Sequence, residues 1–402
     1  MVLRLLPFFL FVHLVVAQTD TMLNDHIFQV DTLEDQRFVA FIAQVSQNSQ
    51  FILIGEQHGI KEVGGFTNAV FDLVHKNGFN TLCIETDALA AEKIKEIAAS
   101  ETPLKLAETL DQKFPLAIPF YGNASDYELF VNVVSRGGNI WGIDQTFMAQ
   151  FRLNFDHLSN YTTNPALKKI TGQLKNRAQL AFEEAFKNKS FGDMFVFKYS
   201  DTLHDSLLAT DPNPKETEIL NQLKKTKEIY GYNASKQYYQ NNNVRGQLMK
   251  ANFNAYYKEA LKSDPIPKVV FKLGATHATR GLSMTKIYDV SNYLSELAVF
   301  NDKRSLHFMV AGITGTALAG NPFMENPITE FNNTKQLPEE LQAAVDGFDK
   351  KYSVIHLEPL REKSYGNRFS ENLKTFIFNY DVLVLVNNAE ALVPFRQNSS
   401  SE

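Results

Sequence analysis

The chain has 402 residues, with 40 Lys or Arg against 45 Asp or Glu, and a formal net charge of −5. This charge excludes nucleic acid as a main partner, because a phosphate backbone is bound by a basic protein face. The apolar share of 44% and the charged share of 21% are typical of a globular protein, and one cysteine excludes a disulfide framework.

The first residues have the pattern of a secretory signal peptide. Arg4 gives a positive start, residues 5–16 are apolar apart from Pro7 and His13, and Ala17 is a small residue before Gln18. We therefore expect residues 1–17 to be removed as a signal peptide and the mature chain to be secreted or periplasmic. No later apolar run approaches the length of a membrane span, so we expect no transmembrane segment in the mature chain.

Seven short runs rich in β-branched and aromatic residues predict strands. They are nearly continuous apolar runs, as is typical of strands that helices cover on both faces. The runs are residues 51–54, 81–84, 139–143, 269–273, 307–310, 354–357 and 382–386. Between the first two runs, apolar residues from Phe66 to Val74 recur at helical spacing and Gly78 follows, which predicts a parallel βαβ unit. Cys83 is expected to be a small buried side chain of the second strand.

Residues 145–263 have a different character, with helical patterns and many Lys and Glu. Pro165 suits the start of a helix, and Asp211-Pro-Asn-Pro214 predicts a break. We interpret this segment as a helical insertion that forms a cap over the sheet. The sequence thus predicts an α/β fold in a single domain over residues 18–402, with a mainly parallel central sheet flanked by helices.

Ionisable residues follow four consecutive predicted strands. Because the carboxyl ends of parallel strands meet at one edge, where ligands of open α/β sheets bind, we expect these residues to converge on a small molecule. Packing does not require charges there. The residues are Glu56 and His58 after the first strand, Glu85 after the second, Asp144 after the third, and His277 and Arg280 after the fourth.

The chemistry of this set favours activated water. Glu56 can hold one tautomer of His58 while the other ring nitrogen acts on a water or a substrate. A Ser or Cys nucleophile is not supported, because the sequence has no Gly-x-Ser-x-Gly elbow and no paired-cysteine motif. Other histidines are expected to be solvated or structural, namely His75, His157, His204, His307 and His356.

These residues also carry a family resemblance that spans about residues 50 to 390. The chain resembles a divergent member of the erythromycin esterase-like superfamily, which includes erythromycin esterases and haem-binding ChaN-like lipoproteins. The matching motifs are Gly55-Glu56-x-His58-Gly59 with Glu62, the strand-terminal Glu85, Arg245-x-x-x-Met249-x-x-Asn252 on a helix, and His277.

The resemblance implies ester hydrolysis by water that the motif histidine activates. His58 would be the general base, Glu56 and Glu85 would orient it or polarise the water, and His277 would steady the oxyanion. Asp144, Arg245 and Arg280 are assigned to binding. Arg245 would be a second positive group or would anchor its helix through Asp144 or Glu85, and both readings stay open. No cofactor is expected for this reaction.

Three departures from the family pattern argue against macrolide-lactone hydrolysis. Gln57 alone separates the motif Glu and His, Gly274 stands where the family has a first histidine, and the helix after the motif lacks the family's arginine. We therefore expect an unassigned small-molecule substrate of apolar or amphipathic character.

Two other function classes stay open. Two histidines with several carboxylates could hold Zn²⁺ or Mn²⁺ in a metal-dependent hydrolase. A non-enzymatic protein of the ChaN-like type would instead bind haem or a lipid-like molecule in an apolar pocket.

Overall fold

A computed structural model describes residues 22–366 and 368–395 of the chain. The predicted signal peptide, residues 1–17, lies outside the described residues. Within them, no helix is both long and apolar enough to cross a bilayer.

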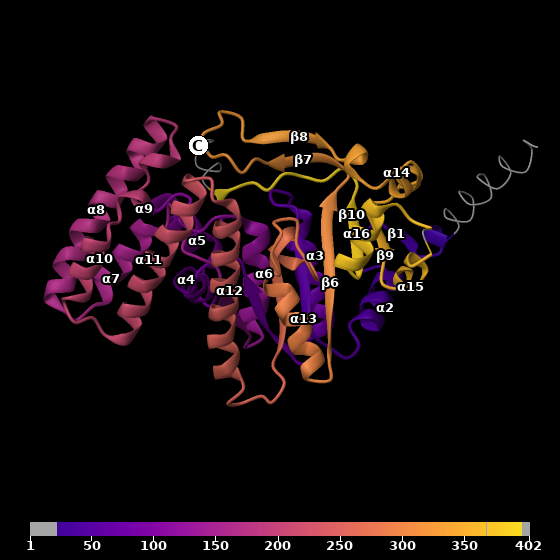
Figure 1. The fold of residues 1–402 in the computed structure, drawn as a ribbon, viewed down its shortest axis with the longest axis horizontal. Helices are drawn as coiled ribbons and strands as arrows, with labels where there is room; N and C mark the ends of the chain where they lie inside the picture. The colour runs from indigo at the N-terminus through magenta and orange to yellow at the C-terminus, as the bar shows by residue number, and fades with distance from the viewer. Residues whose placement is uncertain (1–21, 367, 396–402) are drawn as a thin grey trace, which may run out of the picture.

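An eight-stranded sheet forms the centre of the described chain, with the strand order β1-β9-β10-β6-β2-β5-β3-β4 (Figure 1). The six strands from β10 to β4 are parallel, and β9 runs antiparallel to both of its neighbours. The predicted mainly parallel α/β fold is therefore confirmed. The strands are β1 (Ile27–Val30), β2 (Ser49–Glu56), β3 (Phe79–Ile84), β4 (Asn139–Gly142), β5 (Lys268–Gly274), β6 (Arg304–Gly312), β9 (Tyr352–His356) and β10 (Val382–Val386).

Alternate residues of the central strands pack into two separate cores. In β2, Ile52 and Ile54 join one core, whereas Phe51 and Leu53 join the other. This is why the strands read as continuous apolar runs, since both faces of the sheet are covered by helices. Cys83 is fully buried in the second core, as predicted, and burial raises the pKa of its thiol.

Helices cover both faces of the sheet. The first core is shared with α2 (Gln36–Val45), α3 (Glu62–His75), α4 (Ala88–Ala98), α5 (Pro103–Lys113) and α6 (Ala124–Ser135). The second is shared with α12 (Tyr238–Ala260), α13 (Val290–Phe300), α14 (Glu339–Val345), α15 (Leu360–Ser364) and α16 (Glu371–Asn379).

The segment between β4 and β5 folds into helices with a third apolar core. Figure 1 shows α7 to α11 gathered to one side of the sheet, remote from β9 and β10. Asn164 caps α8 just before Pro165, and Asn213 caps α11 just before Pro214, so both proline signals mark helix starts. The helices between β4 and α12 are α7 (Phe151–Tyr161), α8 (Pro165–Lys187), η1 (Phe191–Asp193), α9 (Phe195–Lys198), α10 (Asp201–Leu208) and α11 (Pro214–Ala234).

A hairpin that the sequence did not predict follows β6. It consists of β7 (Thr314–Leu318) and β8 (Ile328–Asn332), and η3 (Thr334–Gln336) follows it. In Figure 1 the hairpin crosses above the end of β6, at the carboxyl edge of the parallel strands. Its residues are half-buried or exposed, so they form no continuous apolar run by which a strand could be predicted.

Candidate functional site

The carboxyl ends of β2, β3, β4 and β5 deliver ionisable side chains to one cavity of about 470 Å³. These four strands are mutually parallel neighbours, so their ends share one edge, as the strand-end pattern predicts. The helix α12 adds Asn241 and Arg245 to the cavity. Six of the seven predicted site residues line it, namely Glu56, His58, Glu85, Asp144, Arg245 and His277.

His58 and Glu56 form a dyad at the end of β2. The imidazole Nδ1 lies 3.0 Å from Glu56 Oε1, and 36% of the His58 side chain is exposed, against 5% for Glu56. The ring of His58 also stacks on Phe120, with the ring centroids 4.1 Å apart. The chain turns directly after the dyad at Gly59, whose φ of +89° and close approach to Leu318 suit glycine alone. These contacts fix the ring with Nε2 as the nitrogen left for proton transfer.

A buried lysine that the sequence did not predict holds the other side of Glu56. Lys272 on β5 is 2% exposed, and its Nζ lies 2.6 Å from Glu56 Oε2 and 3.2 Å from Asp126 Oδ1. Burial alone would raise the pKa of Glu56, but the charges of Lys272 and His58 lower it to about 2. Glu56 is therefore a carboxylate that both orients His58 and faces a second cation.

Arg245 on α12 joins the two neighbouring carboxylates. Its Nη2 lies 2.7 Å from Glu85 Oε1 and 2.5 Å from Asp144 Oδ2, and its Nε donates to Asp144 Oδ1. Glu85 Oε2 also accepts from the Gly274 amide at 2.5 Å. Arg245 thus anchors α12 to the ends of β3 and β4, and it also lines the cavity.

His277 forms a second dyad with a residue that the sequence analysis missed. It lies on η2 (Ala275–Ala278), directly after β5, and its Nδ1 is 2.7 Å from Asp289 Oδ2. Its Nε2 is 3.6 Å from Glu85 Oε1. Asp289 is fully buried and caps α13 through the amide of Val290, so one carboxylate serves the helix and the histidine.

The two histidines share the direction of their pKa shifts. Burial alone would lower the pKa of His58, but the negative charges of Glu56 and Glu85 outweigh it and raise the pKa. For His277, burial and Arg245 lower the pKa, whereas Glu85 and Asp289 raise it and prevail. The dyad carboxylates therefore stabilise the imidazolium form of each ring.

Arg280 does not reach the cavity, so its assignment to binding is corrected. Its guanidinium binds both carboxylate oxygens of Asp381, at 3.0 and 2.8 Å, and donates to the Ser305 carbonyl. Ser305 is near the start of β6 and Asp381 directly precedes β10, so this pair lies toward the amino ends of the strands. After η2 the chain turns back along the face of the sheet. The short spacing of three residues between His277 and Arg280 therefore does not reveal that the two side chains lie apart.

Other motif residues support the backbone around the site. Glu62 is buried and accepts from Lys351 and from the Glu390 amide, which ties α3 to the segment after β10. Asn252 donates to the Ile143 carbonyl after β4. Gln57, the single residue between Glu56 and His58, accepts from the Gly312 amide at the end of β6.

The donor set does not suit a divalent cation. The carboxylates of Glu56, Glu85 and Asp144 are already paired with Lys272 and Arg245, which would compete with a metal ion. Across the part of the chain that the structure describes, no three His, Cys, Asp or Glu side chains are grouped to hold a metal. The metal-dependent alternative therefore has no matching site among these residues.

Comparison with known proteins identifies the fold. An erythromycin esterase, EreC, crystallised as a histidine-to-asparagine mutant in its open conformation, superposes with a TM-score of 0.58 over 91% of this chain and 98% of its own, at 12% identity. The chain has the erythromycin esterase fold. A succinoglycan biosynthesis protein shares this fold with a TM-score of 0.58 over 94% of this chain and 98% of its own, at 11% identity.

A Bacillus cereus protein also has the erythromycin esterase fold, with a TM-score of 0.58 over 94% of this chain and 99% of its own, at 13% identity. No protein-family model matches the chain, and the comparison with curated proteins gives no match. At this identity the likeness concerns the fold, so chemistry has to be argued from the site itself.

Proposed function

We propose that the protein is an exported esterase-like hydrolase in which His58 activates water. The observation that carries the proposal is the His58–Glu56 dyad, whose Nδ1 is bound at 3.0 Å by a carboxylate while the ring lines the cavity. A carboxylate at Nδ1 fixes the tautomer with the proton on that nitrogen, so Nε2 can accept a proton from water.

The reaction proceeds by one addition and one elimination. The water oxygen attacks the ester carbonyl carbon while its proton passes to His58 Nε2. Arg245 and the imidazolium of His277 line the same cavity and stabilise the oxyanion that forms. The bond from the carbonyl carbon to the alkoxy oxygen then breaks, and His58 returns its proton to that oxygen, which releases a carboxylic acid and an alcohol.

The two dyads suit different tasks. His277 is 13% exposed and is held by Asp289 and Glu85, so a positive charge on this ring is well stabilised. His58 is more exposed and shares Glu56 with Lys272, whose charge opposes protonation of His58. We therefore assign the role of general base to His58, and the role of the cation that stabilises the oxyanion to His277.

A panel of p-nitrophenyl esters with wild type and His58→Ala tests the proposal. Removal of a general base costs about 10²- to 10⁴-fold in kcat. His157→Ala is the matched control. His157 lies on α7 and lines neither this cavity nor a neighbouring cavity of about 650 Å³. Equal turnover by wild type and His58→Ala would overturn the assignment.

Export is part of the proposal and has its own test. Mass spectrometry of the chain recovered from outside the cytoplasm should find a protein that begins at Gln18. A chain retained in the cytoplasm with Met1 or Val2 at its start would contradict export.

A second candidate is a non-enzymatic carrier of haem or a lipid-like molecule. The observation that favours it is a largely apolar cavity of about 650 Å³ that His58 also lines. Purified protein with a Soret band and no ester turnover would favour haem binding over hydrolysis.

A further inference from the structure

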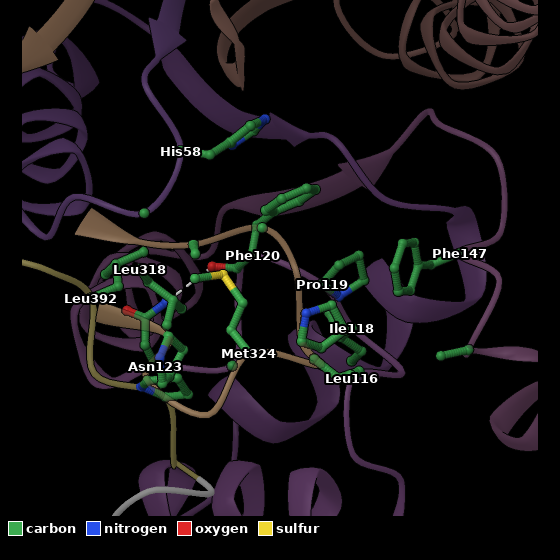
Figure 2. A pocket seen from close by; sticks show the side chains of 18 of the residues that line it. His58, Leu116, Ile118, Pro119, Phe120, Asn123, Phe147, Leu318, Met324 and Leu392 are labelled. Carbon is green, nitrogen blue, oxygen red and sulfur yellow. Dashed lines mark hydrogen bonds between the residues drawn. The ribbon is translucent and has the colours of Figure 1, made fainter. Parts of the chain in front are cut away.

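A second cavity, which we call the apolar cavity, lies against His58 (Figure 2). Its volume is about 650 Å³, within the range of roughly 300–1,000 Å³ that small-molecule sites occupy. Of the residues that line it, His58, Asp111 and Glu325 are titratable. The walls are mainly apolar, with Leu116, Ile118, Phe147, Met194, Leu318 and Met324 among them.

The apolar cavity begins where the proposed chemistry takes place. His58 and Phe120 line both cavities, and so do Phe147 and Met148. Figure 2 shows the ring of Phe120 beside that of His58, with Met324 below it. Phe120 has a φ of +67°, a backbone conformation that is costly for a residue with a side chain, and its ring stacks on that of His58. A ligand with its reacting carbon at His58 can therefore extend directly into apolar space.

The loop between β7 and β8 closes this space against the helical insertion. Leu318, at the end of β7, and Met324, in the loop, line the cavity. The neighbouring Phe323 packs on Phe186 and Phe191, with ring centroids 5.1 and 4.5 Å apart. The unpredicted hairpin thus completes a chamber that the sheet and the insertion form only in part.

The charge of the cavity at the strand ends restricts which chemical group a ligand can place next to His58. With His58 neutral, three carboxylates line this cavity, those of Glu56, Glu85 and Asp144, against the two cations of Arg245 and His277. A phosphate or sulfate group next to His58 would meet this negative set and lose its hydration. A neutral ester group has no such cost.

We propose that the apolar cavity binds the acyl chain of a neutral fatty-acyl ester, with the ester carbonyl at His58. This inference rests on the proposed hydrolase function and names its substrate class. Each CH₂ group that enters the cavity leaves water, so kcat/KM increases about three- to fourfold per carbon until the cavity is full.

A chain-length series measures this directly. The probes are p-nitrophenyl esters from acetate to dodecanoate, and the readout is the ratio of kcat/KM for each ester to that for acetate. The ratio should rise with chain length in wild type and fall at least tenfold for decanoate in Met324→Trp, because the larger ring fills the cavity. Met324 is 41% exposed, which leaves room for the fold to accept this change.

The control variant is Leu180→Trp, which adds the same ring to α8 at a side chain that is 65% exposed. Its chain-length ratios should equal those of wild type. A flat or falling ratio in wild type, or equal losses for acetate and decanoate in Met324→Trp, would overturn the acyl-chain site while leaving ester hydrolysis by His58 intact.

Binding of 1-decanol, measured by calorimetry, separates the site from the chemistry. Saturable binding of decanol to wild type and to His58→Ala, with weaker binding to Met324→Trp, supports the apolar site. If the same proteins hydrolyse no ester, only the hydrolase function is rejected. Acetate turnover that depends on His58, together with no decanol binding, rejects the acyl-chain site and keeps the hydrolase.

Discussion

The imidazole of His58 occupies the space that a side chain at Gly274 would need. A Cβ on Gly274 would lie 2.8 Å from His58 Nε2 and 3.1 Å from Glu85 Oε2. Two departures from the family pattern, the short spacing before His58 and the glycine at 274, are therefore spatially linked. A histidine at position 274 and the ring of His58 at its present place exclude each other.

This relationship predicts the effect of Gly274→Ala. The new methyl group displaces the ring of His58 from its place beside Glu56, because the backbone of β5 cannot retreat. Since a misplacement of about 1 Å can cost about 100-fold, we expect kcat on p-nitrophenyl acetate to fall at least tenfold. Gly172→Ala on α8 is the control, since a Cβ there meets nothing within 4 Å. Full activity of Gly274→Ala would show that His58 need not hold this position.

The acid side of the pH profile reports on the His58–Glu56 pair. His58 accepts a proton when neutral, and its pKa is raised by the charge of Glu56 against the effect of burial. Activity of wild type should therefore increase as the pH rises through a value above 6.5, the ordinary pKa of histidine. Glu56→Gln keeps an acceptor for Nδ1 but removes the charge, so this limb of kcat/KM moves to lower pH. An unmoved limb would assign it to another group.

The alkaline side of the profile reports on His277. The imidazolium of His277 stabilises the oxyanion in the proposed reaction, and the charges of Glu85 and Asp289 raise the pKa of this ring. Activity should fall as the pH rises through that pKa. Asp289→Asn keeps a good cap for α13 but removes one charge, so the pKa of His277 decreases and the alkaline limb moves to lower pH. If kcat is lost without a shift of this limb, Asp289 acts on folding alone.

The sheet and the strand-end residues were predictable because both follow from local pattern. Continuous apolar runs marked seven strands, and the parallel order of β2, β5, β3 and β4 brought Glu56, Glu85, Asp144 and His277 to one edge. The partner of His277 was not predictable, because Asp289 reads as an ordinary helix cap and reaches the ring only through the turn of the chain after η2.

The pairing of Lys272 with Glu56 could have been predicted from the sequence. Lys272 interrupts the apolar run of β5 and points to the same face as Val270, the face that the even-numbered residues of β2 share with Glu56. A lysine buried at this position needs a negatively charged partner, and Glu56 lies on the neighbouring strand. The pairing with Asp126 on α6 required the tertiary structure.

Lys272→Met gives a stability prediction whose magnitude depends on pH. The change leaves the buried carboxylates of Glu56 and Asp126 without their common cation, so we expect the free energy of unfolding in urea at pH 7 to fall by about 3–5 kcal/mol. The pKa of Glu56 is lowered from 4.5 to about 2 in the folded protein. Its stabilising contribution is therefore present above pH 4.5 and is lost as the pH falls toward 2.

The loss caused by Lys272→Met should consequently be larger at pH 7 than at pH 3, because Glu56 takes up a proton more readily in the variant and becomes neutral. Lys268→Met, on the same strand with a half-buried side chain, is the control and should cost less than about 1 kcal/mol at either pH. Equal losses for Lys272→Met at both values of pH would mean that Lys272 stabilises the fold through its packing against Tyr121 rather than through the charge of Glu56.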